Sequence, residues 1–318
     1  MRRRDILRGI GAFSAGALVG CSKSGPTSPS GVPGGTGSVG SAMIVDALRT
    51  GAPVAGAVVT TADGVQHATS PDGSVAVSNG GIVNITAPAQ FGPRRIKAAA
   101  GIHDWLLPDD SQMPGWWIKE ALYGANDFQW LWRPLPGALL VVPAADVFAD
   151  DFAMDAIRQG VGIINGVHRY VSYTVGVPGQ TASRIVQVTL NPSVNAFAQT
   201  SIKATGATTI GALIEFSTFH LDGFPRSLQQ LHAIRAVAHE LAHVSGLSGH
   251  PTPIAGVYTN GMMYGAVPVQ EFAQPEADIL NWMFFREPGT RPPDDSSATP
   301  VVAQNAEPRW HQVCRFNP

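Results

Sequence analysis

Two histidines and a glutamate stand close together in the segment His239-Glu240-Leu241-Ala242-His243. Residues four positions apart share one face of an α-helix, so both imidazoles can reach a single metal ion. Glu240 follows His239 directly, so its carboxylate lies near the same ion without having to bind it. There it can take a proton from a metal-activated water. The spacing predicts a metal site with His239 and His243 as ligands and Glu240 as the catalytic general base and acid.

The residues after this motif extend the pattern. Gly246 lies three positions after His243, and Met263 and Tyr264 follow further along. The segment resembles the metzincin zinc metalloproteases, whose pattern His-Glu-x-x-His-x-x-Gly-x-x-His precedes a methionine turn. The resemblance implies one catalytic Zn²⁺ ion. It also implies that Gly246 allows a sharp turn back to the metal and that Met263 forms a hydrophobic floor under the ligands. Met263 followed by Tyr264 is the form of the turn in matrixin-like members.

The third ligand departs from the family pattern by one position. The family's histidine would fall at Gly249, and His250 comes one residue late. Glycine adds backbone freedom without steric cost, so a loop can absorb such an insertion. We therefore assign His250 as the third metal ligand. The alternative is a distant carboxylate, Glu271 or Glu276, as in thermolysin-like enzymes, but the methionine turn argues against it.

Four further residues have no motif that assigns their role. His232 lies seven residues before His239, on the same helix face, where it either lines the cleft or is hydrogen-bonded in the core. His168 and His220 belong to no motif and are interpreted as structural or surface residues. Tyr258 could donate to a developing oxyanion, although a structural role is favoured.

The chain has two cysteines, Cys21 and Cys314. Cys21 ends the segment Leu18-Val19-Gly20-Cys21, which resembles a bacterial lipobox, and the resemblance implies that this cysteine carries the lipid of a mature lipoprotein. Cys314 would then be alone. We therefore expect no structural disulfide and no cysteine-based zinc site.

The N-terminus is interpreted as a targeting segment. Residues 1–21 contain a positive stretch at 2–4 and a short apolar stretch at 10–20, too short to span a bilayer of about 30 Å as a helix. Residues 3–8 also resemble a twin-arginine export signal. Residues 22–41 are rich in Ser, Gly, Pro and Thr and predict a flexible linker. The protein is expected to be exported and lipid-anchored to the bacterial cell envelope through Cys21.

Short β-rich runs characterise residues 42–100, and turn residues such as Asp72-Gly73 separate them. The run from Gly51 to Ala57 resembles the small transthyretin-like accessory domains of bacterial exported proteins. We expect an antiparallel β-sandwich here, acting as a spacer or binding module.

Residues 101–290 mix helical and strand patterns and are expected to form the zinc metalloprotease domain. The expected elements are helices at 146–165, 228–246 and 275–285 and strands at 171–175, 185–190 and 208–216. The fold class is therefore α+β: an N-terminal sandwich and a metzincin-like domain with a mixed twisted sheet, an active-site helix and a C-terminal helix. In metzincins an edge strand pairs with the extended substrate, and 208–216 is the candidate for that role. Residues 291–318 predict a loose tail.

The charge and tryptophan content of the chain indicate which classes of partner it can bind. The net charge is −2, 14% of the residues are charged and no long basic run occurs, so nucleic acid is not expected as a partner. Five of the seven tryptophans fall between 105 and 132. They could form a sugar or peptide platform, but a buried core at a domain junction is favoured.

These observations predict a zinc-dependent endopeptidase that acts on a peptide or protein substrate. Two alternatives stay open. The displaced third histidine favours a surface-binding lipoprotein with a degenerate, inactive metal site. The tryptophan-rich region favours a non-peptidase zinc amidohydrolase acting on the cell wall.

Overall fold

The computed structural model describes ten stretches of the chain: 41–47, 52–61, 63–77, 82–86, 94–97, 103–107, 113–124, 131–264, 269–285 and 307–316. Cys21, the predicted signal at 1–21 and the predicted linker up to residue 40 lie outside them. Within these stretches, no helix combines the length and apolar character needed to cross a membrane.

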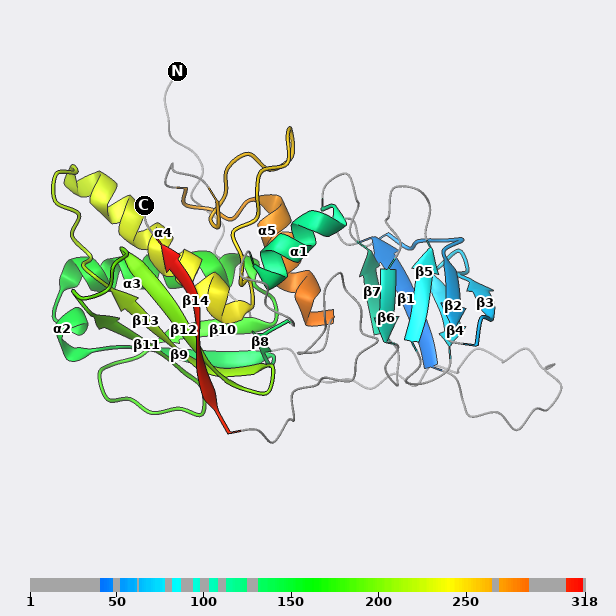
Figure 1. Ribbon diagram of the computed structural model, residues 1–318, viewed down its shortest axis with the longest axis horizontal. Helices are drawn as coiled ribbons and strands as arrows, with labels where there is room; N and C mark the ends of the chain where they lie inside the picture. The colour runs from blue at the N-terminus through cyan, green and yellow to red at the C-terminus, as the bar shows by residue number, and fades with distance from the viewer. Residues whose placement is uncertain are drawn as a thin grey trace, which may run out of the picture. The chain divides into compact units, whose positions relative to one another are not determined.

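The N-terminal part of the described chain forms two small sheets (Figure 1). The first has the order β4-β1-β7, with β1 Ser41–Ala47, β4 Ser74–Val77 and β7 His103–Leu107. The second has the order β3-β2-β5-β6, with β2 Val58–Thr61, β3 Gln66–Ala68, β5 Ile82–Thr86 and β6 Arg94–Lys97. The prediction of a purely antiparallel arrangement was wrong for one pair, because β1 and β7 are parallel. β7 also extends this sheet past residue 100, where the sequence analysis placed a boundary.

A larger mixed sheet follows, in the order β10-β9-β11-β13-β12-β14, with the short β8 pairing with β13. Its strands are β8 Arg133–Pro134, β9 Gly137–Pro143, β10 Val171–Val175, β11 Ile185–Leu190, β12 Ala198–Thr205, β13 Thr208–Phe216 and β14 Arg309–Phe316. The first four strands in that order are parallel to one another, whereas β12 is antiparallel to both of its neighbours. The three strands expected from the sequence are confirmed as β10, β11 and β13.

The sheet departs from the sequence analysis in three places. The strand at 208–216 is not at an edge, because β13 lies between β11 and β12. The strand β12 was missed because three of its four buried residues, Ala198, Thr200 and Ala204, are small or polar and give little hydrophobic alternation. The tail at 291–318 is also not loose throughout, because β14 pairs along the length of β12.

The helices are α1 Gly115–Tyr123, α2 Ala145–Phe148, α3 Asp151–Val167, α4 Arg226–Ser245 and α5 Gln274–Trp282, followed by the 3₁₀ turn η1 Met283–Phe285. The single helix expected at 146–165 is divided into α2 and α3. The division falls at Asp150, whose side chain accepts hydrogen bonds from the backbone N–H groups of Phe152 (2.9 Å) and Ala153 (3.3 Å) and so starts a new helix.

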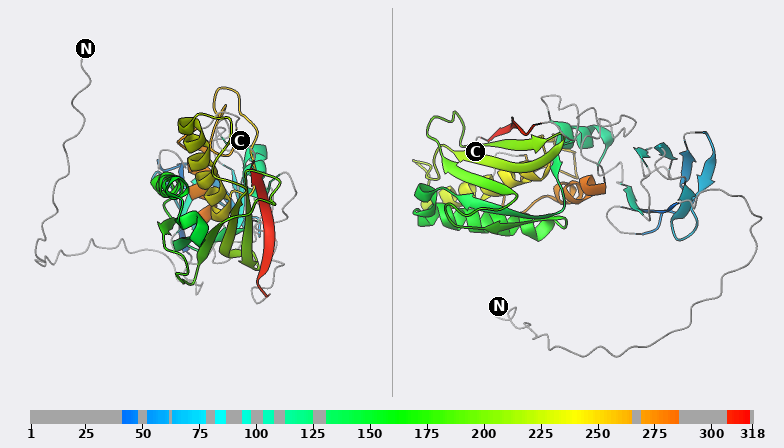
Figure 2. Two further views of the ribbon diagram at one scale, coloured as in Figure 1. Left: turned by 90° about the vertical axis from the view of Figure 1, so that its left-hand side faces the viewer. Right: turned by 90° about the horizontal axis from the view of Figure 1, so that it is seen from below.

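Helices α3 and α4 pack against each other on one face of the large sheet (Figures 1 and 2). Gly160 of α3 stands at their contact, where a Cβ atom would lie 2.6 Å from Cγ1 of Val237 and 3.1 Å from the backbone nitrogen of Ala238. On the sheet side, the Tyr173 hydroxyl lies 2.7 Å from Oγ of Ser245 and 3.2 Å from the carbonyl oxygen of Leu241. These contacts fix the second half of α4, which carries the candidate site.

Candidate metal centre

Helix α4 brings His239 and His243 together as the spacing predicted. Their Nε2 atoms lie 3.1 Å apart, and both side chains are buried. Nδ1 of His239 is 2.9 Å from the carbonyl oxygen of Met262, and Nδ1 of His243 contacts the carbonyl oxygen of Leu247. A carbonyl only accepts, so each Nδ1 carries the proton and each Nε2 presents a lone pair to the space between the rings.

Gly246 ends α4 and turns the chain back toward the site. Its φ of 122° lies in the region that glycine adopts at little cost. A Cβ atom at this position would stand 2.7 Å from Sδ of Met283 and 2.8 Å from the carbonyl oxygen of Trp132. Both the conformation and the space therefore require glycine here.

His250 joins the two helical histidines. Its Nε2 atom lies 3.0 Å from Nε2 of His239 and 3.3 Å from Nε2 of His243. The one-residue displacement has a steric reason, because a Cβ atom on Gly249 would overlap the carbonyl oxygen of Glu120 in α1. A histidine therefore does not fit at 249, and the next residue supplies the imidazole.

Helix α1 holds the segment that carries His250. The backbone N–H of Gly249 donates to the carbonyl oxygen of Ala121 (3.0 Å). The N–H and the hydroxyl of Thr252 both donate to Oε2 of Glu120, each at 2.8 Å. This helix was not predicted from the sequence, yet it determines where the third ligand lies.

Cys314 is the fourth member of the cluster, and here the sequence analysis was wrong. Its Sγ atom lies 3.2 Å from Nε2 of His250 and 3.6 Å from Nε2 of His239. The candidate ligand atoms of the four residues all lie within 4.8 Å of one another. The expectation that no cysteine could take part in a metal site rested on a cysteine pair being needed, whereas one thiol is enough beside three imidazoles.

Five of the six separations among the four ligand atoms are close to those around a single tetrahedral ion. Zinc–nitrogen bonds of about 2.0–2.1 Å and a zinc–sulfur bond of about 2.3 Å place tetrahedral nitrogens about 3.3–3.4 Å apart and a nitrogen and the sulfur about 3.5 Å apart. The observed separations are 3.0–3.3 Å between nitrogens and 3.2–3.6 Å from the sulfur to two of them. The cluster, in which His239, His243 and Cys314 are buried and His250 is exposed, can therefore hold a metal ion, whose identity the geometry alone leaves open.

Electrostatics favour the neutral imidazoles that metal binding needs. Burial lowers the pKa of His239 and His243 well below the usual value, and the neighbouring histidines lower it further. Desolvation also lowers the pKa of His250, with a smaller contribution from the positive charge of Arg235. All three rings are therefore neutral at neutral pH, which is the form that binds a metal ion.

Glu240 lies beside the cluster without joining it. Its Oε2 atom accepts a 2.6 Å hydrogen bond from the Thr200 hydroxyl of β12, whereas its buried Oε1 atom has no hydrogen-bond partner. Burial raises the pKa of Glu240 to about 8, and the hydrogen bond from Thr200 opposes that shift. Thr200, which the sequence analysis did not single out, thus orients the carboxylate.

The methionine segment is held from behind by Glu276. One carboxylate oxygen accepts from the N–H of Met263 (2.7 Å) and the hydroxyl of Tyr258 (2.7 Å). The other accepts from the N–H of Met262 (2.9 Å) and Ala273 (2.8 Å). Glu276 is therefore not the alternative metal ligand, and the Tyr258 hydroxyl points at Glu276 instead of serving an oxyanion.

The remaining candidates lie outside the cluster. Glu271, the other alternative ligand, is exposed on the loop before α5. Met263 is buried, as expected for a floor residue, whereas Tyr264 is 36% exposed and does not pack in the core. His232 and His168 are buried away from the cluster.

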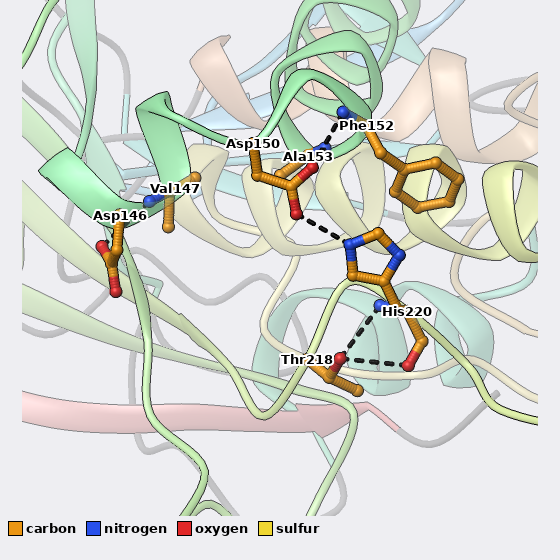
Figure 3. A network of polar contacts seen from close by, with 7 residues as sticks. All are labelled: Asp146, Val147, Asp150, Phe152, Ala153, Thr218 and His220. Carbon is orange, nitrogen blue, oxygen red and sulfur yellow. Dashed lines mark hydrogen bonds and ion pairs between the residues drawn. The ribbon is translucent and has the colours of Figure 1, made fainter.

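His220 forms a surface pair instead of a metal site. Its Nε2 atom lies 2.8 Å from Oδ2 of Asp150, and its ring stacks on Phe152 with centroids 4.7 Å apart (Figure 3). Of the described tryptophan side chains in the Trp-rich region, Trp117 and Trp132 are buried and Trp116 is 48% exposed. The buried members agree with the preferred core interpretation.

Comparisons with known proteins add no family assignment. The sequence matches no protein-family model, and a search of curated proteins gives no match. The candidate site is therefore judged on its own geometry.

Proposed function

We propose that this chain is a zinc-dependent endopeptidase in which His239, His243 and His250 hold the ion. One observation carries the proposal: three Nε2 atoms converge within 3.0–3.3 Å beside a buried glutamate whose Oε1 atom is unpartnered. Three protein nitrogens with an adjacent carboxylate that does not bind the metal are typical of catalytic zinc sites.

In the proposed reaction, Glu240 would carry the proton and Thr200 would hold the Glu240 carboxylate in position. Bound Zn²⁺ would supply a water with a pKa near 7 and would polarise the scissile carbonyl. Oε1 of Glu240 takes the water's proton while Thr200 keeps Oε2 in place. Burial raises the pKa of Glu240, which would help the carboxyl to hold that proton and then pass it to the departing amine nitrogen.

The arrangement of β12 supports a polypeptide substrate. Its residue Thr200 contacts Glu240 of α4, so β12 is the strand beside the site. An extended chain segment, β14, already pairs antiparallel with β12 across this place. Main-chain pairing with a strand binds extended peptides with little dependence on their sequence.

Two rival functions make different predictions. Cys314 closes the cluster with a fourth protein donor, which favours a metal-binding lipoprotein without hydrolase activity. The support for a cell-wall amidohydrolase was the tryptophan-rich region as an aromatic platform. The burial of Trp117 and Trp132 weakens that support.

We further propose that the protein is exported and anchored by a lipid on Cys21, because the lipobox-like segment ends there. Expression in a bacterium with a labelled fatty acid should label the wild-type chain and leave Cys21→Ser unlabelled. Labelling of both would show that the lipid, if present, is elsewhere.

The decisive experiment measures zinc content and hydrolysis in parallel. Casein, a peptide library and peptidoglycan fragments are offered to the full chain and to Cys314→Ser, since Cys314 contacts the metal cluster. In whichever form cleaves peptides, Glu240→Ala should retain one zinc and lose hydrolysis, whereas the exposed Glu271→Ala should keep both. Zinc binding without cleavage of any substrate by either form would support the binding-protein rival, and cleavage of peptidoglycan alone would support the amidohydrolase.

A further inference from the structure

We propose that β14 is a built-in inhibitor: it occupies the substrate's place along β12 and contributes Cys314 as a fourth metal ligand. The inference rests on the proposed function for the statement that this place belongs to a substrate.

The register of β14 is what aims Cys314 at the metal cluster. His311 pairs with Ile202 and Gln312 with Ser201, but Cys314 pairs with Thr200, so Val313 is an extra residue in β14. In a regular strand, Val313 would stand opposite Thr200 and Cys314 would face away from α4. The bulge turns the thiol to the face on which Thr200 contacts Glu240.

The burial pattern agrees with this register. Arg309, Trp310 and Gln312 are exposed, whereas Val313 and Cys314 are only 7% and 5% exposed. The buried pair Val313 and Cys314 therefore lies at the metal cluster.

The attachment of β14 is suited to release. In the part of the chain that the structure describes, β14 pairs with β12 alone and ends the sheet (Figures 1 and 2). Its side-chain contacts include His311 against the ring of Trp132, with centroids 3.9 Å apart, and Gln312 Nε2 donating to Gln199 Oε1 at 3.1 Å. If β14 left, β12 would still be paired with β13, and the core residues uncovered on β14 itself would be Val313 and Cys314.

The number of protein ligands decides whether the metal site is open or closed to water and substrate. A catalytic zinc site has three protein ligands and one open position, whereas a site with four protein ligands is closed. With Cys314 bound, neither a water nor a substrate carbonyl has a place on the ion. When β14 leaves, the fourth position and the edge of β12 become available together.

The test uses the full chain in a Cys21→Ser background, where Cys314 is the only thiol, and compares it with Cys314→Ser. Cobalt replaces zinc as a spectroscopic probe. We expect a cobalt–thiolate charge-transfer band in the parent that is lost in Cys314→Ser, with one metal retained in both. Iodoacetamide should alkylate Cys314 at least about tenfold more slowly with zinc than without it, because a thiolate that binds a metal is protected.

Inhibition is tested separately with peptides. A fluorescent, non-cleavable peptide should bind Cys314→Ser at least about tenfold more tightly than the parent, because the tethered strand competes at high effective concentration. A synthetic peptide with the sequence of residues 309–316 should displace the probe, and the same peptide with Ser in place of Cys should do so more weakly.

The outcomes separate this proposal from the proposed function. Tight probe binding by Cys314→Ser without hydrolysis would support inhibition and count against the endopeptidase. Absence of the thiolate band, or equal peptide binding and hydrolysis in both forms, would overturn the inhibitor. Loss of the metal from Cys314→Ser would also overturn it, since Cys314 would then be a structural ligand.

Discussion

Gly249 stands against the backbone of Glu120, so close that a Cβ atom at 249 would overlap the Glu120 carbonyl oxygen and lie 2.7 Å from Cα of Gly124. The two residues are 129 positions apart in the chain, yet this contact decides which residue becomes the third ligand. With Gly249 flat against α1, the imidazole of His250 reaches the two helical histidines.

Gly249→Ala should therefore destabilise the fold and weaken metal binding together. The new methyl group must push the 247–252 segment away from α1, at a cost of about 1–3 kcal/mol in the free energy of unfolding. Denaturant unfolding of the metal-free protein and cobalt titration measure the two effects. Gly162→Ala is the matched control. It replaces a glycine of α3, and the added Cβ meets nothing within 4 Å. It should leave stability equal or slightly higher, and an equal loss in both variants would contradict the steric account.

Asp150 should give the fold a pH dependence on the acid side. Burial raises the pKa of this carboxyl, but hydrogen bonds from His220 and from the N–H groups of Ala153 and Phe152 outweigh that effect and lower its pKa below 3.8. A carboxyl whose pKa is lower in the folded state contributes stability above its unfolded pKa of 3.8 and loses it as the pH falls through the folded value. Asp150→Ala should lower the free energy of unfolding by about 1 kcal/mol at pH 7. Urea unfolding should show that this difference from wild type shrinks below pH 3.8.

Two variants separate the helix cap from the histidine pair shown in Figure 3. Asp150→Ser keeps an oxygen for the α3 N–H groups, whereas His220→Ala leaves the cap in place and removes the 2.8 Å partner and the ring that stacks on Phe152. We expect Asp150→Ser to recover most of the stability at neutral pH. If His220→Ala were as destabilising as Asp150→Ala, the cap would not be the main contribution.

Glu276→Gln should loosen the methionine segment and, through it, the metal site. Four donors converge on this carboxylate, and an amide would turn its own N–H₂ group toward two of them. The expected loss is about 2–4 kcal/mol in unfolding free energy. Metal affinity should fall as well, because Met262 holds Nδ1 of His239. Glu271→Gln, an exposed neighbour, should change neither quantity, and a stable Glu276→Gln with normal metal affinity would refute this role.

The sequence predicted the parts of the site whose geometry is local. His239, Glu240 and His243 share one helix, and helical periodicity is enough to place them together. The position of His250 depends on α1, and its late place in the pattern has no local explanation. Cys314 lies 64 residues beyond His250, and only strand pairing with a bulge brings it near. Such pairing cannot be inferred from one sequence, because every residue of β12 except Ile202 is small or polar and the alternation is hidden.

Thr200→Val should slow hydrolysis without removing the metal. Valine keeps the shape of threonine but cannot donate to Oε2 of Glu240, which is 2.6 Å from the hydroxyl. The carboxylate then loses the partner that orients its free oxygen, and changes to such supporting hydrogen bonds typically cost about 10-fold or more in activity. The measurement is kcat and zinc content in the Cys314→Ser background, which lacks the thiol ligand. Thr200→Ser retains the hydroxyl and should restore most of kcat. A serine variant as slow as valine would assign the effect to packing in β12, and a valine variant as fast as the parent would remove Thr200 from the mechanism.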